Sequence, residues 1–260
     1  MSAEQKLFLR KLKIQNILVK LSQLFIIVIF FVAWELCSRY RIINPFIFSS
    51  PSAIIETIIN LANQGNLFIH IYTTLYEVII AFTLGIGLGF LVAILLYLSR
   101  FLARVLDPFL TMLNSLPKIA LGPLLIIWIG ANTKSIIVMA LLINLIVSII
   151  TIYNGFLQTD KTRIKLLQSF KASKFQILTK VVIPSSYTTI ISSLKLNISM
   201  TLVGVIMGEF LVSKSGIGYL IIYGTQIFNL NLVMTGIILL VIMSYILYKI
   251  IAKIEEKILK

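Results

Sequence analysis

The chain has 260 residues, of which 59% are hydrophobic and 12% are charged, and its formal net charge is +14. A soluble domain carries about 25% charged residues, so this composition excludes the soluble classes and indicates an integral membrane protein. The basic residues lie between long apolar runs, where anionic lipid headgroups attract them. The positive charge therefore argues for a membrane surface and against nucleic acid as a partner.

A transmembrane helix needs about 20 apolar residues to cross the roughly 30 Å hydrocarbon core. This criterion predicts an all-α integral membrane protein with six spans. Residues 1–20 then form a basic N-terminal segment, 21–66 the first span and an external helix, 67–254 a core with a loop at 158–185, and 255–260 a tail. The spans are expected at about 21–39, 68–98, 108–129, 135–157, 186–212 and 230–251.

Basic residues near the span ends predict the orientation of the chain. Seventeen Lys and Arg residues fall on one side of the expected spans and four on the other, with Lys118 and Lys195 inside spans. Loops rich in Lys and Arg face the cytoplasm. We therefore expect both termini and the loop at 158–185 in the cytoplasm of a cell-membrane protein.

Two local patterns predict how helices begin and pack. After the first span, Ser50 can cap a helix whose first position is Pro51, which predicts a short external interfacial helix. In the second span, Gly85 and Gly89 lie four residues apart on one face and predict close packing against a neighbouring helix.

The third expected span contains two helix breakers. Pro117 and Pro123 each remove a backbone donor, which predicts a kinked helix beside a cavity. No P-loop pattern occurs in the chain, so ATP binding is not expected here.

Few residues are available for covalent or metal chemistry. Cys37 is the only cysteine and cannot form an internal disulfide, and His70 is the only histidine and cannot build a metal site by itself. No nucleophile has a suitable base, and no pair of carboxylates falls at a helical spacing. We expect no catalytic residue, no metal and no cofactor bound by this chain.

Charged residues inside spans are costly, by about 2.5 to 3.5 kcal/mol on insertion scales, and need an explanation. Headgroup contact or snorkelling accounts for Glu35, Glu77 and Lys195. Lys118 and Glu209 either face a polar translocation path or tie helices together, and the sequence leaves both readings open.

The loop between the fourth and fifth spans contains the lysine-rich stretch KLLQSFKASKFQILTKVVIP. Apolar residues recur at helical spacing on both sides of a polar break near 171–173, which predicts two short amphipathic helices, and Pro184 predicts an extended turn before the fifth span. Such a segment either lies on lipid headgroups or places its apolar face in a groove of another protein. That face contains Ile164, Leu167, Phe170, Phe175, Leu178 and Val182.

This loop resembles the signature of the permease subunits of ATP-binding-cassette (ABC) importers: Glu-Ala-Ala, three residues, Gly, nine residues, Ile, one residue, Leu-Pro. Ile183 and Pro184 match the closing pair and Val181 matches the isoleucine, whereas 165–167 replace Glu-Ala-Ala and Lys171 replaces the glycine. Other segments are similar, in the same order, to the nitrate, sulfonate and taurine type, a subgroup that includes permeases for thiamine-pyrimidine precursors. These segments are FSSPSAIIETI, LPKIALGPLLIIWIG, KASKFQILTKVVIPSS and VGVIMGEFLVSKSGIGYLI.

The resemblance implies a type I ABC importer permease fold and a homodimer of six-span subunits. It implies a separate ATPase partner that uses ATP and Mg, an external solute-binding protein, and a small sulfonate-, nitrate- or taurine-like anion or thiamine-pyrimidine-like precursor as substrate. The chain itself would then be a transporter subunit and not an enzyme. The implied ATPase-docking residues are Ile164, Leu167, Phe170, Lys171, Ala172, Ser173, Phe175, Leu178 and Pro184.

Two alternatives stay open. Glycine tolerates a positive φ angle and lysine is strained by it, so either the turn at Lys171 is ordinary helix or Lys171 itself meets an acidic patch on the ATPase. The alternative function is a self-contained secondary transporter or channel, a class that more often shows inverted repeats or several acids within spans.

Overall fold

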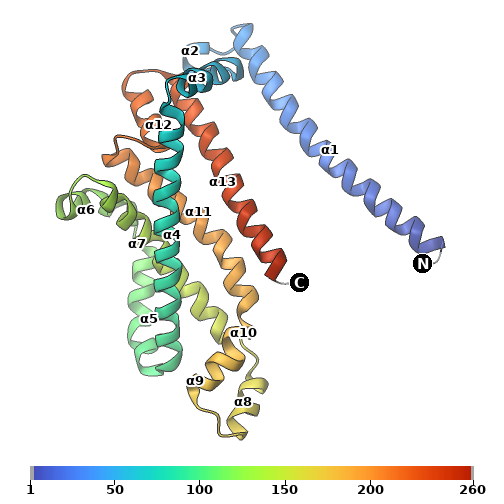
Figure 1. The fold of residues 1–260 in the computed structure, drawn as a ribbon, viewed down its shortest axis with the longest axis vertical. Helices are drawn as coiled ribbons and strands as arrows, with labels where there is room; N and C mark the ends of the chain where they lie inside the picture. Colours follow the sequence, from blue (N-terminus) through green and yellow to red (C-terminus); the bar gives the residue numbers. More distant parts are fainter. Residues whose placement is uncertain (1–2, 259–260) are drawn as a thin grey trace.

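The computed structural model describes residues 3–258, and the regular structure among them is helical (Figure 1). Long helices form one bundle, and short helices cover its two ends. In chain order the helices are α1 (Ala3–Arg39), α2 (Pro45–Phe48), α3 (Pro51–Asn63), α4 (Asn66–Leu98), α5 (Arg100–Ser115), the 3-10 turn η1 (Lys118–Leu121), α6 (Gly122–Ile129), α7 (Thr133–Leu157), α8 (Lys161–Ser169), α9 (Lys174–Ile177), the π-helix η2 (Leu178–Val182), α10 (Ile183–Ser185), α11 (Tyr187–Val212), α12 (Ile217–Gln226) and α13 (Leu230–Ile258).

Five of the described helices, α1, α4, α7, α11 and α13, are long and apolar enough to cross a membrane. α5 and the segment formed by η1 and α6 pass the same test only as a pair, and they meet at 86°. The kink predicted in the span at 108–129 is therefore confirmed, and the crossing begins earlier than expected, at Arg100. Leu116 takes an extended conformation before Pro117, which is what a following proline ring favours, and the helix stops there.

Glycines on α4 fix the direction of α7. A Cβ atom at Gly85 would lie 2.3 Å from Asn144 Nδ2, and one at Gly89 would lie 2.5 Å from Ser148 Cβ. Both contact positions advance by four residues, so α4 and α7 run parallel. The α5–α6 pair must return the chain between them, which makes it one broken crossing and brings the number of crossings to six.

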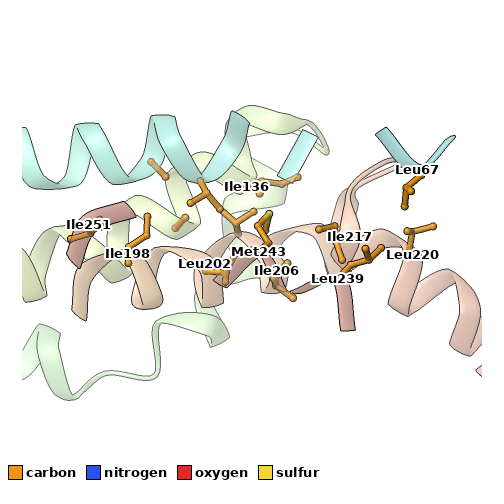
Figure 2. Packing of buried hydrophobic residues seen from close by; sticks show 14 of the residues in the cluster. Leu67, Ile136, Ile198, Leu202, Ile206, Ile217, Leu220, Leu239, Met243 and Ile251 are labelled. Carbon is orange, nitrogen blue, oxygen red and sulfur yellow. The ribbon is translucent and has the colours of Figure 1, made fainter. Parts of the chain in front are cut away.

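α11 packs against α7 in the opposite direction. A Cβ atom at Gly204 would lie 2.6 Å from the Ala140 Cα atom, and one at Gly208 would lie 2.9 Å from Ile136 Cγ2. Lipid tails are as apolar as these side chains, so close approach at small residues stabilises the bundle more than exclusion of water does. Figure 2 shows the resulting core, where residues such as Ile136, Leu202 and Met243 meet.

α1 is longer than expected, because it begins at Ala3 and includes most of the basic segment assigned to residues 1–20. It leans away from the bundle, and its most apolar stretch is unburied (Figure 1). Its far end is tied down where Trp34 Nε1 donates to Phe48 O at 3.2 Å. Glu35, which was expected to meet headgroups, accepts hydrogen bonds from the Ser52 backbone and hydroxyl at 3.0 and 2.9 Å.

The short helix predicted after the first span is confirmed as α3. The Ser50 hydroxyl accepts a hydrogen bond from Ala53 N at 3.2 Å, and Pro51 occupies the first turn. Ile54 is buried against the bundle while Ile55 and Ile59 remain exposed. α3 and α12 lie at one end of the bundle, and α8 and α9 lie at the other (Figure 1).

Candidate functional site

The loop at 158–185 contains the two predicted short helices, and each begins with a side-chain cap. Asp160 Oδ1 accepts a hydrogen bond from Thr162 N at 2.8 Å, which starts α8 and holds the pKa of Asp160 below its ordinary value. Ser173 Oγ accepts from Gln176 N at 3.2 Å and Gln176 Oε1 accepts from Ser173 N at 2.8 Å, a reciprocal cap that starts α9.

The turn between α8 and α9 is set by Lys171, which has a φ angle of 59°. Lys171 N donates to Gln168 O at 2.9 Å and Ala172 N donates to Leu167 O at 3.1 Å. These two bonds form a Schellman motif, whose left-handed position glycine normally occupies. An ordinary helical turn at Lys171 is therefore excluded, and the lysine bears a backbone conformation that costs an L-residue about 1 to 2 kcal/mol.

The apolar residues of the loop divide between two faces. Leu178 and Val182 are fully buried, and Ile164, Leu167 and Ala172 pack with them against α4 and α7. The expectation that this whole apolar set faces a partner is wrong, because most of it faces the chain's own bundle.

The opposite face of the loop is exposed. Phe170 is 73% exposed and Phe175 is 61% exposed, on either side of Lys171 and Ser173, which are exposed as well. Pro184 is also exposed, but it lies nearer the bundle, in α10. The linker between α8 and α9 lies at the extreme end of the molecule (Figure 1).

The loop joins α11 without the extended turn predicted at Pro184. Ile183 has helical φ and ψ angles of −58° and −51°, and its N–H donates to Leu178 O, five residues back. The wider π turn gives room to the proline ring, which has no N–H to donate. Ser186 Oγ then donates to Gly155 O at 2.9 Å, so the loop continues rigidly into α11 and is tied to α7.

A buried polar cluster lies at the other end of the bundle, around the start of α12. The backbone N–H groups of residues 216–218 donate to His70 Nδ1 at 3.0 Å, Thr74 Oγ1 at 2.8 Å and Glu209 Oε2 at 2.5 Å. Side chains of α4 and α11 thereby satisfy the free N–H groups of this helix end. Glu209 is fully buried and ties helices together, one of its two expected roles.

Lys118 lies apart from Glu209. Its Nζ donates to Asn114 O at 3.2 Å, across the bend between α5 and η1, and its side chain is partly exposed. The structure therefore does not bring the two candidate path residues together.

Glu77 was expected at the headgroups, and this is wrong. It is fully buried beside Glu209 and Thr133, and neither of its carboxyl oxygens has a hydrogen-bond partner among the described residues. Two acidic side chains, one from α4 and one from α11, thus lie together in a buried site.

Lys195 was expected to extend its side chain toward water, and the structure adds a partner for its amine. It forms an ion pair with Glu255 of α13, and its Nζ lies 5.7 Å from the centre of the Tyr248 ring. Ser192 Oγ donates to the same glutamate at 2.8 Å. The pair ties α11 to α13.

Sequence reasoning missed a polar network in the middle of the bundle. Ser148 Oγ lies 2.9 Å from Asn144 Oδ1 and 3.1 Å from Asn197 Oδ1, and all three residues are fully buried. Asn144 Nδ2 reaches the Ala81 carbonyl at 3.4 Å. The sequence did contain a sign of this network. Asn144 and Ser148 are four residues apart, as Gly85 and Gly89 are on α4, so the two pairs can face each other.

Six crossings, with a capped two-helix loop held against one end of the bundle, define the membrane subunit of a transporter. Residues 85–259 match the family described as "Binding-protein-dependent transport system inner membrane component", and the chain belongs to this family. It is a multi-pass inner-membrane permease of the ABC importer type, and the alternative of a self-contained secondary transporter or channel is not favoured.

Named relatives agree with this class. The chain is 30% identical over 228 residues to a "Probable ABC transporter permease protein" of Haemophilus influenzae, covering 88% of this chain and 92% of the relative. It is 28% identical over 227 residues to SsuC of Bacillus subtilis, which is named as a candidate aliphatic sulfonates transport permease protein. This match covers 87% of this chain and 82% of the relative.

A solved structure confirms the fold class. An inward-facing structure of the MetNI methionine ABC transporter matches with a TM-score of 0.66 at 20% identity, covering 75% of this chain and 97% of the matched chain. This likeness establishes the type I permease fold alone.

Proposed function

We propose that this chain works as one half of a homodimeric permease, with a separate ATPase docked on the α8–α9 end and an external solute-binding protein at the α3–α12 end. The observation that carries the proposal is the pair of exposed phenylalanines, Phe170 and Phe175, on a loop whose other face is locked to the bundle. Family membership supports the same assignment.

The orientation follows from charge. The basic residues of the α8–α9 loop, of the chain ends and of the α4–α5 junction fall on one side of the crossings, and this side is cytoplasmic by the positive-inside rule. The start of α1 and the end of α13 both lie away from α3, which supports placing them on one side of the membrane (Figure 1). The ATPase, which uses ATP and Mg, then meets the loop from the cytoplasm.

The exposed side of the loop suits a protein partner. Large aromatic side chains that lose their exposure on binding contribute strongly to protein interfaces. Lys171 lies between Phe170 and Phe175 and would favour an acidic patch on the ATPase. The docking residues are therefore Phe170, Lys171, Ser173 and Phe175, a narrower set than the resemblance implied.

The loop can transmit movement because its inner face is fixed. Leu178 and Val182 are buried in the bundle, and the π-helix runs without a flexible joint into α11. A shift of the loop by the ATPase would displace α7 and α11 together, and these helices carry the central network of Asn144, Ser148 and Asn197. ATP hydrolysis in the partner would thereby alternate the opening of the path.

For the substrate we propose a small organic anion of the sulfonate, nitrate or taurine type, with a thiamine-pyrimidine-like precursor as the alternative. The name of the Bacillus relative supports the first class. Lys118, at the α5–α6 bend, remains the candidate path residue that would favour an anion. Lys118→Met should then lower uptake of the anion while insertion and dimer assembly stay intact, whereas unchanged uptake would assign Lys118 a structural role.

The docking proposal is tested by affinity purification of the tagged chain from its native membranes. The wild-type chain should retain an ATPase subunit that carries a P-loop sequence, and Phe170→Asp with Phe175→Asp should lose it. Phe228→Asp is the matched control, because Phe228 is 74% exposed and precedes α13 at the opposite end. Retention of the ATPase by the double variant would overturn the docking surface.

A further inference from the structure

A cavity of about 560 Å³ lies between the 158–185 loop and the ends of α4 and α7. Its walls come from the last turns of the two spanning helices, from α8 and from α9. We propose that this cavity binds one anionic phospholipid, with the phosphate on its basic rim and the acyl chains along its apolar floor. The inference rests on the cytoplasmic placement of the loop in the proposed function.

The rim of the cavity is positive. Arg100, Lys161, Lys165 and Lys174 line it, and none of the described lining residues is acidic. Lys174 Nζ donates to Leu98 O at 3.4 Å, so it is held at the end of α4. Arg100, Lys161 and Lys165 have no ion pair among the described residues, which leaves their charge available for a ligand.

The acid nearest in sequence is engaged elsewhere. Asp160 Oδ1 accepts the capping bond from Thr162 N at 2.8 Å, and its Oδ2 lies 4.0 Å from Arg163 Nε. Asp160 and Arg163 do not line the cavity. The positive rim therefore lacks a counter-charge, and a phosphate diester would supply it.

The floor of the cavity is apolar. Leu96, Phe156 and Ile177 are buried there, and Leu157 is 54% exposed at the edge. A free inorganic anion gains nothing from such a floor, whereas a diacyl lipid covers it with its chains. The combination of basic rim and apolar floor therefore favours a lipid over a soluble phosphate.

The cavity also lies at the right depth. α7 has 25 residues, so at ~1.5 Å per residue its length only slightly exceeds the roughly 30 Å hydrocarbon core. Its last residues, Phe156 and Leu157, belong to the cavity wall. The cavity is thus at headgroup level, where basic pockets between helices hold anionic lipid headgroups.

The test uses the purified full-length chain in neutral detergent and measures phosphatidylglycerol retained in native mass spectrometry. Lys161→Gln with Lys165→Gln should weaken retention by roughly 30-fold, since each basic residue contributes about 1 kcal/mol. Lys171→Gln with Lys180→Gln is the matched control, because it removes the same charge from the same loop outside the cavity. Lys161→Arg with Lys165→Arg should retain the lipid.

Three outcomes would overturn the lipid site. Equal losses in the two Gln pairs would mean that the loop's overall charge attracts lipid without a site. Equal retention of phosphatidylcholine, which is zwitterionic, would mean that the cavity does not select for a net negative headgroup. Binding of glycerol 3-phosphate as strong as that of phosphatidylglycerol would assign the rim to a soluble anion. Because no ATPase is present, loss of the lipid site would leave the docking proposal standing.

Discussion

Thr74 Oγ1 donates a 2.6 Å hydrogen bond to Glu209 Oε1 while it accepts one from Ile217 N at 2.8 Å. A single hydroxyl therefore connects α4, α11 and α12 at the end of the bundle opposite the 158–185 loop. In a buried site, each unmet donor or acceptor costs about 1 to 3 kcal/mol.

Thr74→Val should therefore lower the unfolding temperature of the detergent-purified chain, because the isosteric valine leaves Ile217 N and the Glu209 carboxyl each without this partner. We expect a loss of about 1 to 3 kcal/mol. Thr74→Ser keeps the hydroxyl and should stay close to wild type. Fluorescence-detected size-exclusion chromatography after heating measures both, and a valine variant as stable as wild type would contradict the role of this bond.

The glycines of α4 offer a comparison within one helix. Gly89→Ala should destabilise the chain by about 1 to 3 kcal/mol, because overpacking forces helices apart, and the new Cβ would lie 2.5 Å from Ser148 Cβ and 3.3 Å from Ile149 N. Gly87→Ala meets nothing within 4 Å, so it should be neutral or stabilising by up to about 1 kcal/mol. The same heating assay ranks the two, and the opposite order would refute the parallel packing of α4 on α7.

Lys171 allows backbone strain to be separated from charge. Lys171→Gly should slow hydrogen exchange at the amide of Ala172, because glycine adopts the φ angle of 59° without strain. Lys171→Ala removes the same charge and keeps the Cβ, so it should exchange as wild type does. If exchange at the Ala172 amide slowed equally in both variants, the lysine charge, and not backbone strain, would be what lowers the stability of the α8–α9 turn.

Acid should loosen the start of α8. Asp160 has a pKa below its ordinary value of 3.8 because its ionised form accepts the Thr162 N–H. The cap therefore contributes its full stability above about pH 4 and loses it as the pH falls through the lowered pKa. After correction for intrinsic rates, the Thr162 amide should exchange faster at pH 3 than at pH 6, and in Asp160→Asn the two pH values should agree. A pH-independent wild type would exclude the ionised cap.

The crossings were predictable because a helix in lipid must pair its backbone N–H and C=O groups within itself. The length of an apolar run is therefore enough to identify a crossing. The span expected at 68–98 is α4, Asn66–Leu98, and the one expected at 186–212 is α11, Tyr187–Val212. The cap of α3 was predictable for a similar reason, since Ser50 and Pro51 act within one turn. Apolar length and helix caps are both properties of a single segment, so they can be predicted without knowing which helix packs against it.

The partners of buried charges were not predictable. Glu77 and Glu209 are 132 positions apart, and Lys195 and Glu255 are 60 apart, so only the packing of the helices reveals that they meet. The left-handed Lys171 was hidden because lysine rarely takes this conformation. The π-helix before Pro184 was hidden because its bonding depends on how α11 docks against α7.

The most direct measurement places a photo-crosslinking amino acid at position 175 in native membranes. The account predicts a light-dependent crosslink from this position to the ATPase subunit, and none from the same residue at position 228. The two side chains are comparably exposed, at 61% for Phe175 and 74% for Phe228, and they lie at opposite ends of the bundle. A crosslink to the ATPase from position 228, or its absence at 175 while the ATPase co-purifies, would contradict docking on the α8–α9 loop.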